Sequence, residues 1–208
     1  MGNAFEYDEI AEEVFGPIFG IIADDIISTT GIDKGSLLDI GCGGGHMGYA
    51  VMDRGTFHPV CLLDKNDEAI SKAEQRGKEL GKSDEVDYVI GNVECLPIQD
   101  DSFDLVVSRG SMPFWDDQRK AFSEIHRVLK PNGCAYVGGG LGNKEQKERI
   151  FKIFANNDRG FKPFDRKKSK TLPDAEYEKL FGELKCEYRI INDPDKGHWF
   201  IIRKTQND

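Results

Sequence analysis

Five short apolar segments that alternate with longer amphipathic ones constrain the fold of this 208-residue chain more than any other feature. They are residues 36–41 (SLLDIG), 58–64 (HPVCLLD), 86–92 (VDYVIGN), 103–110 (FDLVVSRG) and 133–140 (GCAYVGGG), and each is typical of a buried strand. Helical patterns lie between them at 44–54, at 66–81 with Asn66 as the expected N-cap, and at 117–133, which Pro131-Asn132-Gly133 is expected to end. This alternation predicts a parallel sheet with helices on both faces.

The segments that flank this core have other patterns. Isoleucines at helical intervals between residues 7 and 30 predict one or two helices, with a break near Gly16-Pro17. After residue 140 we expect helices at 143–156 and 173–184, followed by strands at 186–193 and 197–204. The short connection PDKG between those last strands requires them to be antiparallel neighbours.

Together these patterns predict one α/β domain with a Rossmann-like, doubly wound sheet of seven strands. The sheet is expected to be mostly parallel, with an antiparallel hairpin at its C-terminal edge. Four regions are expected: an N-terminal helical cap (1–34), a cofactor-binding core (36–140), an insertion (141–172), and a closing helix with two strands (173–208). The insertion is rich in Phe, Lys and Arg, so it could form a lid over a substrate or pack its aromatic rings into the core.

Composition limits the partners of the chain. A formal net charge of -9 disfavours nucleic-acid binding, and the basic cluster at 161–170 is interpreted as a solvated surface rather than an anion site. No stretch has the roughly 20 apolar residues that cross a membrane, and the acidic start differs from a signal peptide, so we expect no membrane association and a cytoplasmic location. The five cysteines form no C-x-x-C pair, which predicts reduced thiols and no metal site. The oligomeric state is left open.

A glycine-dense turn follows the first predicted strand, in the sequence LLDIGCGGGHMG at 37–48. Glycines let a backbone turn sharply and bring its N–H groups against a ligand, and a following helix adds the positive end of its dipole. Residues 43–48 also match the pattern G-x-G-x-x-G of dinucleotide-binding proteins. A tight turn without a ligand would have the same letters, so the turn alone leaves both interpretations open.

Two carboxylates decide between these interpretations. Asp39 lies just before the turn, where its charge would repel a pyrophosphate and attract a cation or hydroxyl and amine donors. S-adenosylmethionine offers a sulfonium, an ammonium and a ribose, and it has no phosphate. Asp64 ends the next strand, at the place and distance expected for binding ribose hydroxyls, although an Asp there is as often a helix cap.

With these residues in place, the sequence resembles the class I S-adenosylmethionine-dependent methyltransferases of the small-molecule "type 11" kind over residues 36–140. Four ordered motifs carry the resemblance: LDIGCGGG, LLDKNDEAI, GNVECLPIQDDSFD, and FDLVVSRG with the later EIHRVLKPNG. The resemblance implies S-adenosyl-L-methionine as the cofactor. It also implies the residues that bind this cofactor, which are Asp39, Gly41, Cys42, Gly43 and His46 near the methionine part, Asp64 at the ribose, Lys65, Asn92 and Val93 near the adenine, and Ser108 and Arg109 close by.

The sequence departs from the family pattern at three places. The family usually has Asp at the position of Asn92, whose amide oxygen can still accept a hydrogen bond from adenine, and an apolar residue at the position of Lys65. A His pair often follows the fourth strand in the family, whereas this chain has SMPFW. Phe114 and Trp115 in that stretch are as consistent with a pocket wall as with a hydrophobic staple at a helix start.

The expected reaction is transfer of a methyl group to a small-molecule acceptor by in-line displacement. Such a displacement depends mainly on alignment and exclusion of water, so the sequence assigns no catalytic base. His46 and Tyr7 are weak candidates for that role, and His46 is expected more often to pack against the cofactor. Two alternatives are a non-catalytic module that binds S-adenosylmethionine and an oxidoreductase that binds NAD.

Overall fold

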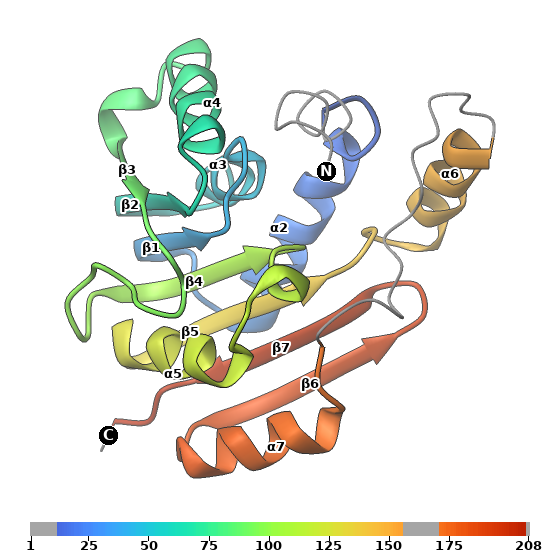
Figure 1. Cartoon of the computed structure of the whole chain (residues 1–208). Coiled ribbons are helices and arrows are strands. Elements are labelled where there is room, and N and C mark those ends of the chain that lie inside the picture. Colours follow the sequence, from blue (N-terminus) through green and yellow to red (C-terminus); the bar gives the residue numbers. More distant parts are fainter. Residues whose placement is uncertain (1–11, 156–170, 207–208) are drawn as a thin grey trace.

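A seven-stranded sheet with the order β3-β2-β1-β4-β5-β7-β6 forms the centre of the molecule (Figure 1). The computed structural model describes residues 12–155 and 171–206. The strands are β1 (Lys34–Ile40), β2 (Thr56–Asp64), β3 (Val86–Ile90), β4 (Phe103–Arg109), β5 (Leu129–Gly139), β6 (Glu187–Asp193) and β7 (Gly197–Arg203). Strands β1 to β5 pair in parallel, and β7 pairs antiparallel with both β5 and β6. The predicted sheet with its antiparallel C-terminal hairpin is therefore confirmed.

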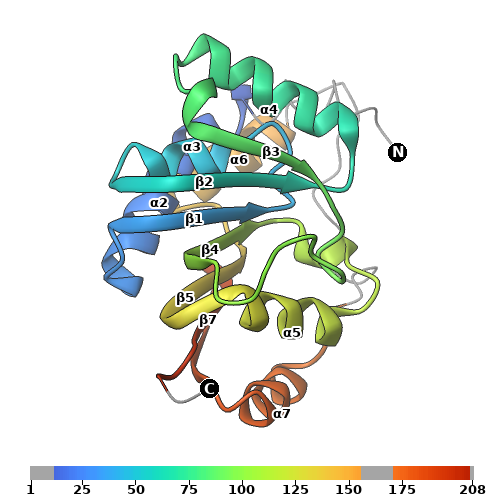
Figure 2. The same ribbon diagram turned by 90° about the vertical axis from the view of Figure 1, so that its left-hand side faces the viewer.

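Helices cover both faces of this sheet (Figure 2). One face packs against α2 (Gly16–Thr30), α3 (His46–Met52), α4 (Asp67–Glu79) and α6 (Lys144–Ala155), and the other against α5 (Gln118–Val128) and α7 (Asp174–Glu183). Two short 3-10 helices, η1 (Ser83–Glu85) and η2 (Met112–Phe114), lie in the connections. Because both faces are covered, the central parallel strands carry uninterrupted buried apolar stretches, such as residues 60–63 of β2 and 105–107 of β4.

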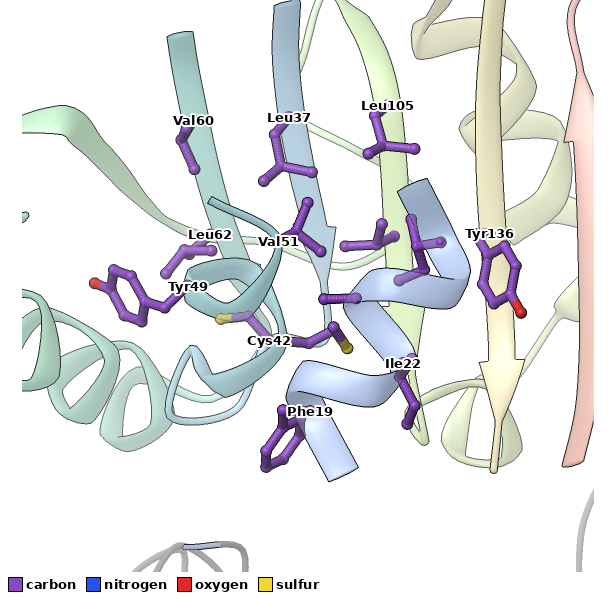
Figure 3. Packing of buried hydrophobic residues seen from close by; sticks show 14 of the residues in the cluster. Phe19, Ile22, Leu37, Cys42, Tyr49, Val51, Val60, Leu62, Leu105 and Tyr136 are labelled. Carbon is purple, nitrogen blue, oxygen red and sulfur yellow. The ribbon is translucent and has the colours of Figure 1, made fainter. Parts of the chain in front are cut away.

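The division of the core follows from the period of two along each strand. Leu37 of β1 faces α2 and α3, whereas the next residue, Leu38, faces α5 and α7. Figure 3 shows the first of these clusters, in which Phe19 and Ile22 of α2 lie over side chains of the central strands. Leu37 and Leu38 are both completely buried.

The structure corrects one predicted boundary. The helix expected at 117–133 ends at Val128, and β5 begins at the next residue. Leu129 is fully buried and pairs with Phe103 of β4, so its apolar side chain satisfies a strand as well as it would a last helical turn. Asn132 takes a left-handed conformation (φ 66°), and its N–H donates to the Lys204 carbonyl at the end of β7. The other predicted elements differ from the observed ones by a few residues at their ends.

Several local predictions have direct counterparts. The chain turns at residues 14–15, and α2 then starts at Gly16 with Pro17 in its first turn. The Asn66 side chain accepts a hydrogen bond from the Glu68 N–H and so caps α4. All five cysteines are free thiols, and Cys61 and Cys134 are buried in β2 and β5.

Over residues 12–155 and 171–206, no helix is both long and apolar enough to cross a membrane.

Alanine substitutions at two helical glycines are expected to change the stability of the fold in opposite directions. A Cβ added at Gly77 of α4 would lie 2.1 Å from the Tyr88 hydroxyl oxygen and 2.4 Å from that of Tyr49, whereas a Cβ at Gly182 of α7 would have no atom within 4 Å. We expect Gly77→Ala to lower the free energy of unfolding by about 1–3 kcal/mol through overpacking. Gly182→Ala should raise it by about 0.5–1 kcal/mol through reduced chain entropy. Urea unfolding of both variants measures the two signs, and a stabilised Gly77→Ala would show that the space beside the tyrosines is not closed.

Candidate functional site

The candidate site lies where the strand order of the sheet reverses. Strand β1 pairs with β2 on one side and with β4 on the other. The chain continues from β1 to β2 and β3 on the first side, and β4 then begins the second side of the sheet. At such a reversal the loops that leave the carboxyl ends of the strands diverge and leave a crevice between them. The turn after β1, the segment after β2 and the segment after β4 meet at this point.

Two adjoining cavities occupy this crevice. The turn cavity, of about 270 Å³, lies beside the glycine turn and is also lined by Phe19, His46, Lys72 and Arg109. The loop cavity, of about 260 Å³, lies beside residues 91–94 and is also lined by Lys65, Trp115 and Asp116. Residues that line both cavities are Gly41, Asp64, Asn66, Ser111 and Phe114. The cavities are therefore neighbouring parts of one elongated crevice.

The crevice brings together most of the predicted site residues. The turn cavity is lined by Asp39, Gly41, Cys42, Gly43, His46, Asp64 and Arg109, and the loop cavity by Gly41, Asp64, Lys65, Asn92 and Val93. Ser108 lines neither cavity, because its side chain is buried beneath them, where its hydroxyl donates to the Ile40 carbonyl at 2.7 Å. Tyr7 and the basic cluster at 161–170 lie outside the described residues.

The glycine turn binds to its neighbouring strand through the amides that were expected to face a ligand. The N–H groups of Gly41 and Cys42 both donate to the Leu63 carbonyl of β2, at 2.7 and 3.0 Å. The N–H of Gly43 donates to Oδ2 of Asp64 at 3.0 Å. The expectation that the turn offers its amides to a ligand is therefore wrong at these three positions. A phosphate, which needs such donors, would find them already engaged.

The glycines of the turn serve two purposes. Gly43 has φ 54°, and a Cβ at this position would meet no atom within 4 Å, so it leaves open space at the cavity wall. Gly48 instead makes room for packing, since a Cβ there would lie 2.4 Å from Leu62 Cδ2 and 3.2 Å from Asp39 Oδ2. The turn thus leaves open space in the cavity at Gly43 and packs closely against the sheet at Gly48.

Asp39 lines the turn cavity, and one of its two carboxylate oxygens is buried without a hydrogen-bond partner among the described residues. It lies near the end of β1 and is 1% exposed. Its Oδ2 accepts a hydrogen bond from the Gly48 N–H at 2.8 Å, and within the part of the chain that the structure describes its Oδ1 has no hydrogen-bond partner. The pKa of this carboxyl group is raised from 3.8 to about 7, mainly because burial disfavours the charged form; the Gly48 hydrogen bond partly offsets this effect, and the nearby charge of Asp64 adds to it. A cation or a donor placed in the cavity would restore the lost solvation.

Asp64 lies between the two cavities. Its Oδ2 accepts from the Gly43 N–H and its Oδ1 from the Asn66 N–H, each at 3.0 Å. The structure assigns the capping of α4 to the side chain of Asn66, so Asp64 is not the cap of this helix. Each carboxylate oxygen has a further lone pair with which it can accept from a hydroxyl group.

The wall of the turn cavity opposite α4 comes from α2. The Phe19 ring stacks on the His46 ring with their centroids 4.9 Å apart and their planes 6° apart. The guanidinium carbon of Arg109 lies 5.0 Å from the ring centroids of both Phe15 and Phe19. These contacts connect the N-terminal helix to the end of β4 and to the glycine turn. The sequence analysis missed Phe19, because its helical spacing is also that of an ordinary core residue.

The loop after β3 is held in place from α5. The Arg127 guanidinium donates to the carbonyls of Ile98 and Leu96 at 2.8 and 3.2 Å, and to Glu124. Glu124 in turn accepts from the Leu96 N–H at 2.8 Å, and its hydrogen bond with Arg127 lowers the pKa of its carboxyl group. The Asn92 oxygen accepts from the Glu94 N–H at 3.0 Å. These contacts fix the loop that lines the outer part of the crevice.

The SMPFW stretch forms the remaining wall. Phe114 lines both cavities with a side chain that is 58% exposed, and Trp115 lines the loop cavity while packing edge-on against Phe122 of α5. Both aromatic residues therefore contribute to the wall of the crevice. Ser111 also lines both cavities, and the sequence analysis missed it because a single serine in a connection carries no pattern.

Comparison with known proteins identifies the family to which this fold belongs. Residues 38–137 match the family model of a methyltransferase domain. The crystal structure of a protein from Methanococcus maripaludis, assigned as an S-adenosyl-L-methionine-dependent methyltransferase, superposes with a TM-score of 0.87 at 37% sequence identity. The superposition covers 97% of this chain and 92% of that one. The chain belongs to the S-adenosyl-L-methionine-dependent methyltransferases, and S-adenosyl-L-methionine is the cofactor of this family.

Curated relatives share only part of their length with the chain. The ubiquinone/menaquinone biosynthesis C-methyltransferase UbiE of Francisella philomiragia is 30% identical over 136 residues, which are 64% of this chain and 54% of that protein. The 2-methyl-6-phytyl-1,4-hydroquinone methyltransferase 1 of rice (Oryza sativa) is 33% identical over 103 residues, or 50% of this chain and 30% of that protein. The chain thus spans about half or less of the length of these relatives.

The raised pKa of Asp39 predicts a pH-dependent affinity. A cationic ligand favours the ionised carboxylate, so it must displace the proton that Asp39 holds below pH 7. We expect S-adenosylmethionine to bind about tenfold more weakly at pH 6 than at pH 8, with proton release at the lower pH. Asp39→Asn should flatten this profile, while Asp87→Asn on the exposed surface of β3 should keep it. Calorimetry in buffers of different ionisation enthalpy measures both the affinity and the number of protons released. An affinity of Asp39→Asn that still falls tenfold from pH 8 to pH 6 would contradict the role of Asp39.

Proposed function

We propose that the protein transfers a methyl group from S-adenosylmethionine to a small-molecule acceptor. The observation that carries this proposal is the polarity of the crevice floor. Oδ1 of Asp39 is a buried acceptor without a partner among the described residues, and Asp64 lies beside it. The amides of Gly41, Cys42 and Gly43 are used inside the protein. A floor of this kind favours a ligand with cationic and donor groups over one with phosphates.

The shape of the crevice supports a definite placement of the cofactor. In the proposed arrangement the methionine part lies in the turn cavity with its ammonium near Asp39, and the adenosine part lies in the loop cavity near Lys65, Asn92 and Val93. Asp64, which lines both cavities, accepts hydrogen bonds from the ribose. Ser108 acts from beneath the floor, and Arg109 lies at the edge of the turn cavity towards α2.

The cofactor, when bound, supplies a methyl group that is already activated by the positive charge on sulfur. The residues of the chain therefore need to align the two reactants and to exclude water. Phe19 and Phe114 are suited to exclude water, since both place aromatic rings at the turn cavity. The stacking of His46 on Phe19 favours a packing role for this histidine over that of a general base. The proposal assigns no residue as a base.

The acceptor is proposed to be a small molecule for two reasons. The related proteins from F. philomiragia and rice carry names that refer to quinone biosynthesis and to a hydroquinone, which are small molecules. In addition, a net charge of -9 is unfavourable for a nucleic-acid substrate. Phe19, the residue of α2 that lines the turn cavity, is placed to contact this acceptor.

Calorimetric titration tests the cofactor, and a transfer assay tests the reaction. We expect S-adenosylmethionine and S-adenosylhomocysteine to bind at one site and NAD not to bind. Radiolabelled methyl transfer is then measured against a panel of thiols, amines, phenols and hydroquinones. Binding without transfer to any member of a broad panel would favour a non-catalytic binding module, and binding of NAD alone would overturn the proposal.

Removal of the Asp64 carboxylate should weaken cofactor binding. We expect Asp64→Ala to raise the dissociation constant by about 5- to 150-fold, which corresponds to about 1–3 kcal/mol for hydrogen bonds to a charged group. Asp67→Ala is a matched control, because Asp67 is a neighbouring acidic residue at the start of α4 that lines neither cavity. Equal affinities of wild type and Asp64→Ala would remove Asp64 from the site.

A further inference from the structure

Ser111 occupies the junction of the turn cavity and the loop cavity. It lines both of them, and it lies directly before η2 in the connection that follows β4. Its side chain faces Gly41 so closely that a Cβ on this glycine would be 2.4 Å from Ser111 Cβ and 2.6 Å from Ser111 Oγ. Gly41 therefore leaves room for this serine, and the two residues together form the floor at the narrow point of the crevice.

The hydroxyl group of Ser111 belongs to a closed hydrogen-bond network. Its Oγ lies 2.6 Å from Ser108 Oγ and 3.3 Å from the Ile40 carbonyl oxygen, and the indole N–H of Trp115 donates to it at 3.2 Å. Ser108 Oγ lies 2.7 Å from the same Ile40 carbonyl. All four groups are part of the described chain, so the possible position of each proton can be worked out from the donors and acceptors in the network.

Either direction of the serine pair uses the Ser111 proton inside the protein. If Ser108 donates to Ile40, the shorter of the two contacts to that carbonyl, then Ser111 donates to Ser108 and keeps one lone pair. The reverse direction, in which Ser108 donates to Ser111 and Ser111 donates to Ile40, uses the longer contact of 3.3 Å and would leave Ser111 without a free lone pair, because its oxygen would accept from both Ser108 and Trp115. In both cases Trp115 can only donate, because an indole nitrogen has no lone pair for a hydrogen bond. The shorter contact from Ser108 to the Ile40 carbonyl favours the first arrangement, in which Ser111 presents one free lone pair, and no O–H donor, to the cavity.

The network is rigid because Ser108 and Trp115, the two side chains that hold Ser111, are buried. Ser108 is 1% exposed and Trp115 is 6% exposed, and the Trp115 ring packs edge-on against Phe122 with their centroids 5.8 Å apart. A hydroxyl that is held in one orientation acts as a fixed dipole whose negative end points in a constant direction. A fixed dipole stabilises a positive charge without having to reorient when the ligand arrives.

We propose that Ser111 is the residue that recognises the positive charge on the sulfur of the cofactor, with Trp115 as the positioning residue that fixes its oxygen. The proposal rests on the proposed function, because it requires the methionine part in one cavity and the adenosine part in the other. The sulfur of S-adenosylmethionine joins these two parts, and Ser111 lies where the two cavities join. Asp64 accounts for the ribose and Asp39 for the ammonium, so the acceptor oxygen of Ser111 is left for the sulfonium.

This assignment separates the substrate form of the cofactor from the product form. S-adenosylhomocysteine has the same ribose, adenine and amino acid groups, but its sulfur is neutral. Because it also lacks the transferable methyl group, a change in the ratio of the two affinities reports a contact with the charged sulfur or with that methyl group. A loss of folding, of packing or of a ribose contact would weaken both ligands by the same factor.

Calorimetric binding of the two ligands tests the proposal. We expect Ser111→Ala to raise the dissociation constant of S-adenosylmethionine by about fivefold, as for one lost hydrogen-bond-like contact to a charged group, and that of S-adenosylhomocysteine by less than about twofold. Trp115→Phe, which removes the N–H donor and keeps an aromatic ring against Phe122, should change the ratio in the same direction by a smaller factor. Ser123→Ala on α5, where the hydroxyl donates to the Arg119 carbonyl of its own helix, is the matched control and should keep the ratio of the wild type.

The outcomes distinguish this proposal from the proposed function. Equal weakening of both ligands in Ser111→Ala, or no change of either, would overturn the role of Ser111 and leave the proposed function standing. Failure of the wild-type protein to bind either ligand would overturn both. If Ser111→Ala does not fold, the ratio measured with Trp115→Phe decides, and a wild-type ratio in that variant would overturn the proposal.

Discussion

The position of β1 in the middle of the parallel strands is the constraint on which the site depends. Asp39 of β1 is level with Leu62 of β2 and with Val107 of β4, so the three strands end close to the same height. The chain leaves β1 through the glycine turn and α3 towards β2, whereas β4 arrives on the other side after α4 and β3. The crevice is the consequence of this reversal: Asp39 and Asp64 lie at the ends of β1 and β2, and Ser111 lies just beyond the end of β4.

The hydrogen bonds of the turn explain why a glycine pattern shared with dinucleotide-binding proteins has another use here. The amides of Gly41 and Cys42 donate to the Leu63 carbonyl at the carboxyl end of β2, and the amide of Gly43 donates to the Asp64 carboxylate. These bonds fix Asp64 between the two cavities and leave acceptors on the crevice floor. The buried Asp39 has an energetic cost, which the free protein lowers by raising the pKa of the group to about 7. A bound cation would offset this cost directly.

The sheet could be predicted from the sequence because burial on both faces produces uninterrupted apolar runs, and because a four-residue connection allows only antiparallel strands. The boundary near Leu129 could not, since a buried leucine satisfies a helix and a strand equally. Asp39 and Asp64 were predictable as polar residues at the ends of apolar strands. Phe19 and Ser111 were not, because their place in the crevice depends on how α2 and the β4 connection pack in three dimensions, and no local pattern records this packing.

The two sides of the crevice come from different parts of the chain. The floor, with its acceptor oxygens, lies within residues 38–137, which match the methyltransferase domain. The α2 wall, with Phe15 and Phe19 around the Arg109 guanidinium, lies before that region. A substitution in α2 can therefore alter the rings and the charge that face the turn cavity without moving Asp39, Asp64 or Ser111, which are held by strand ends and by their own hydrogen bonds. The polar floor of the crevice and the shape of the space above it are for this reason physically separable in this protein.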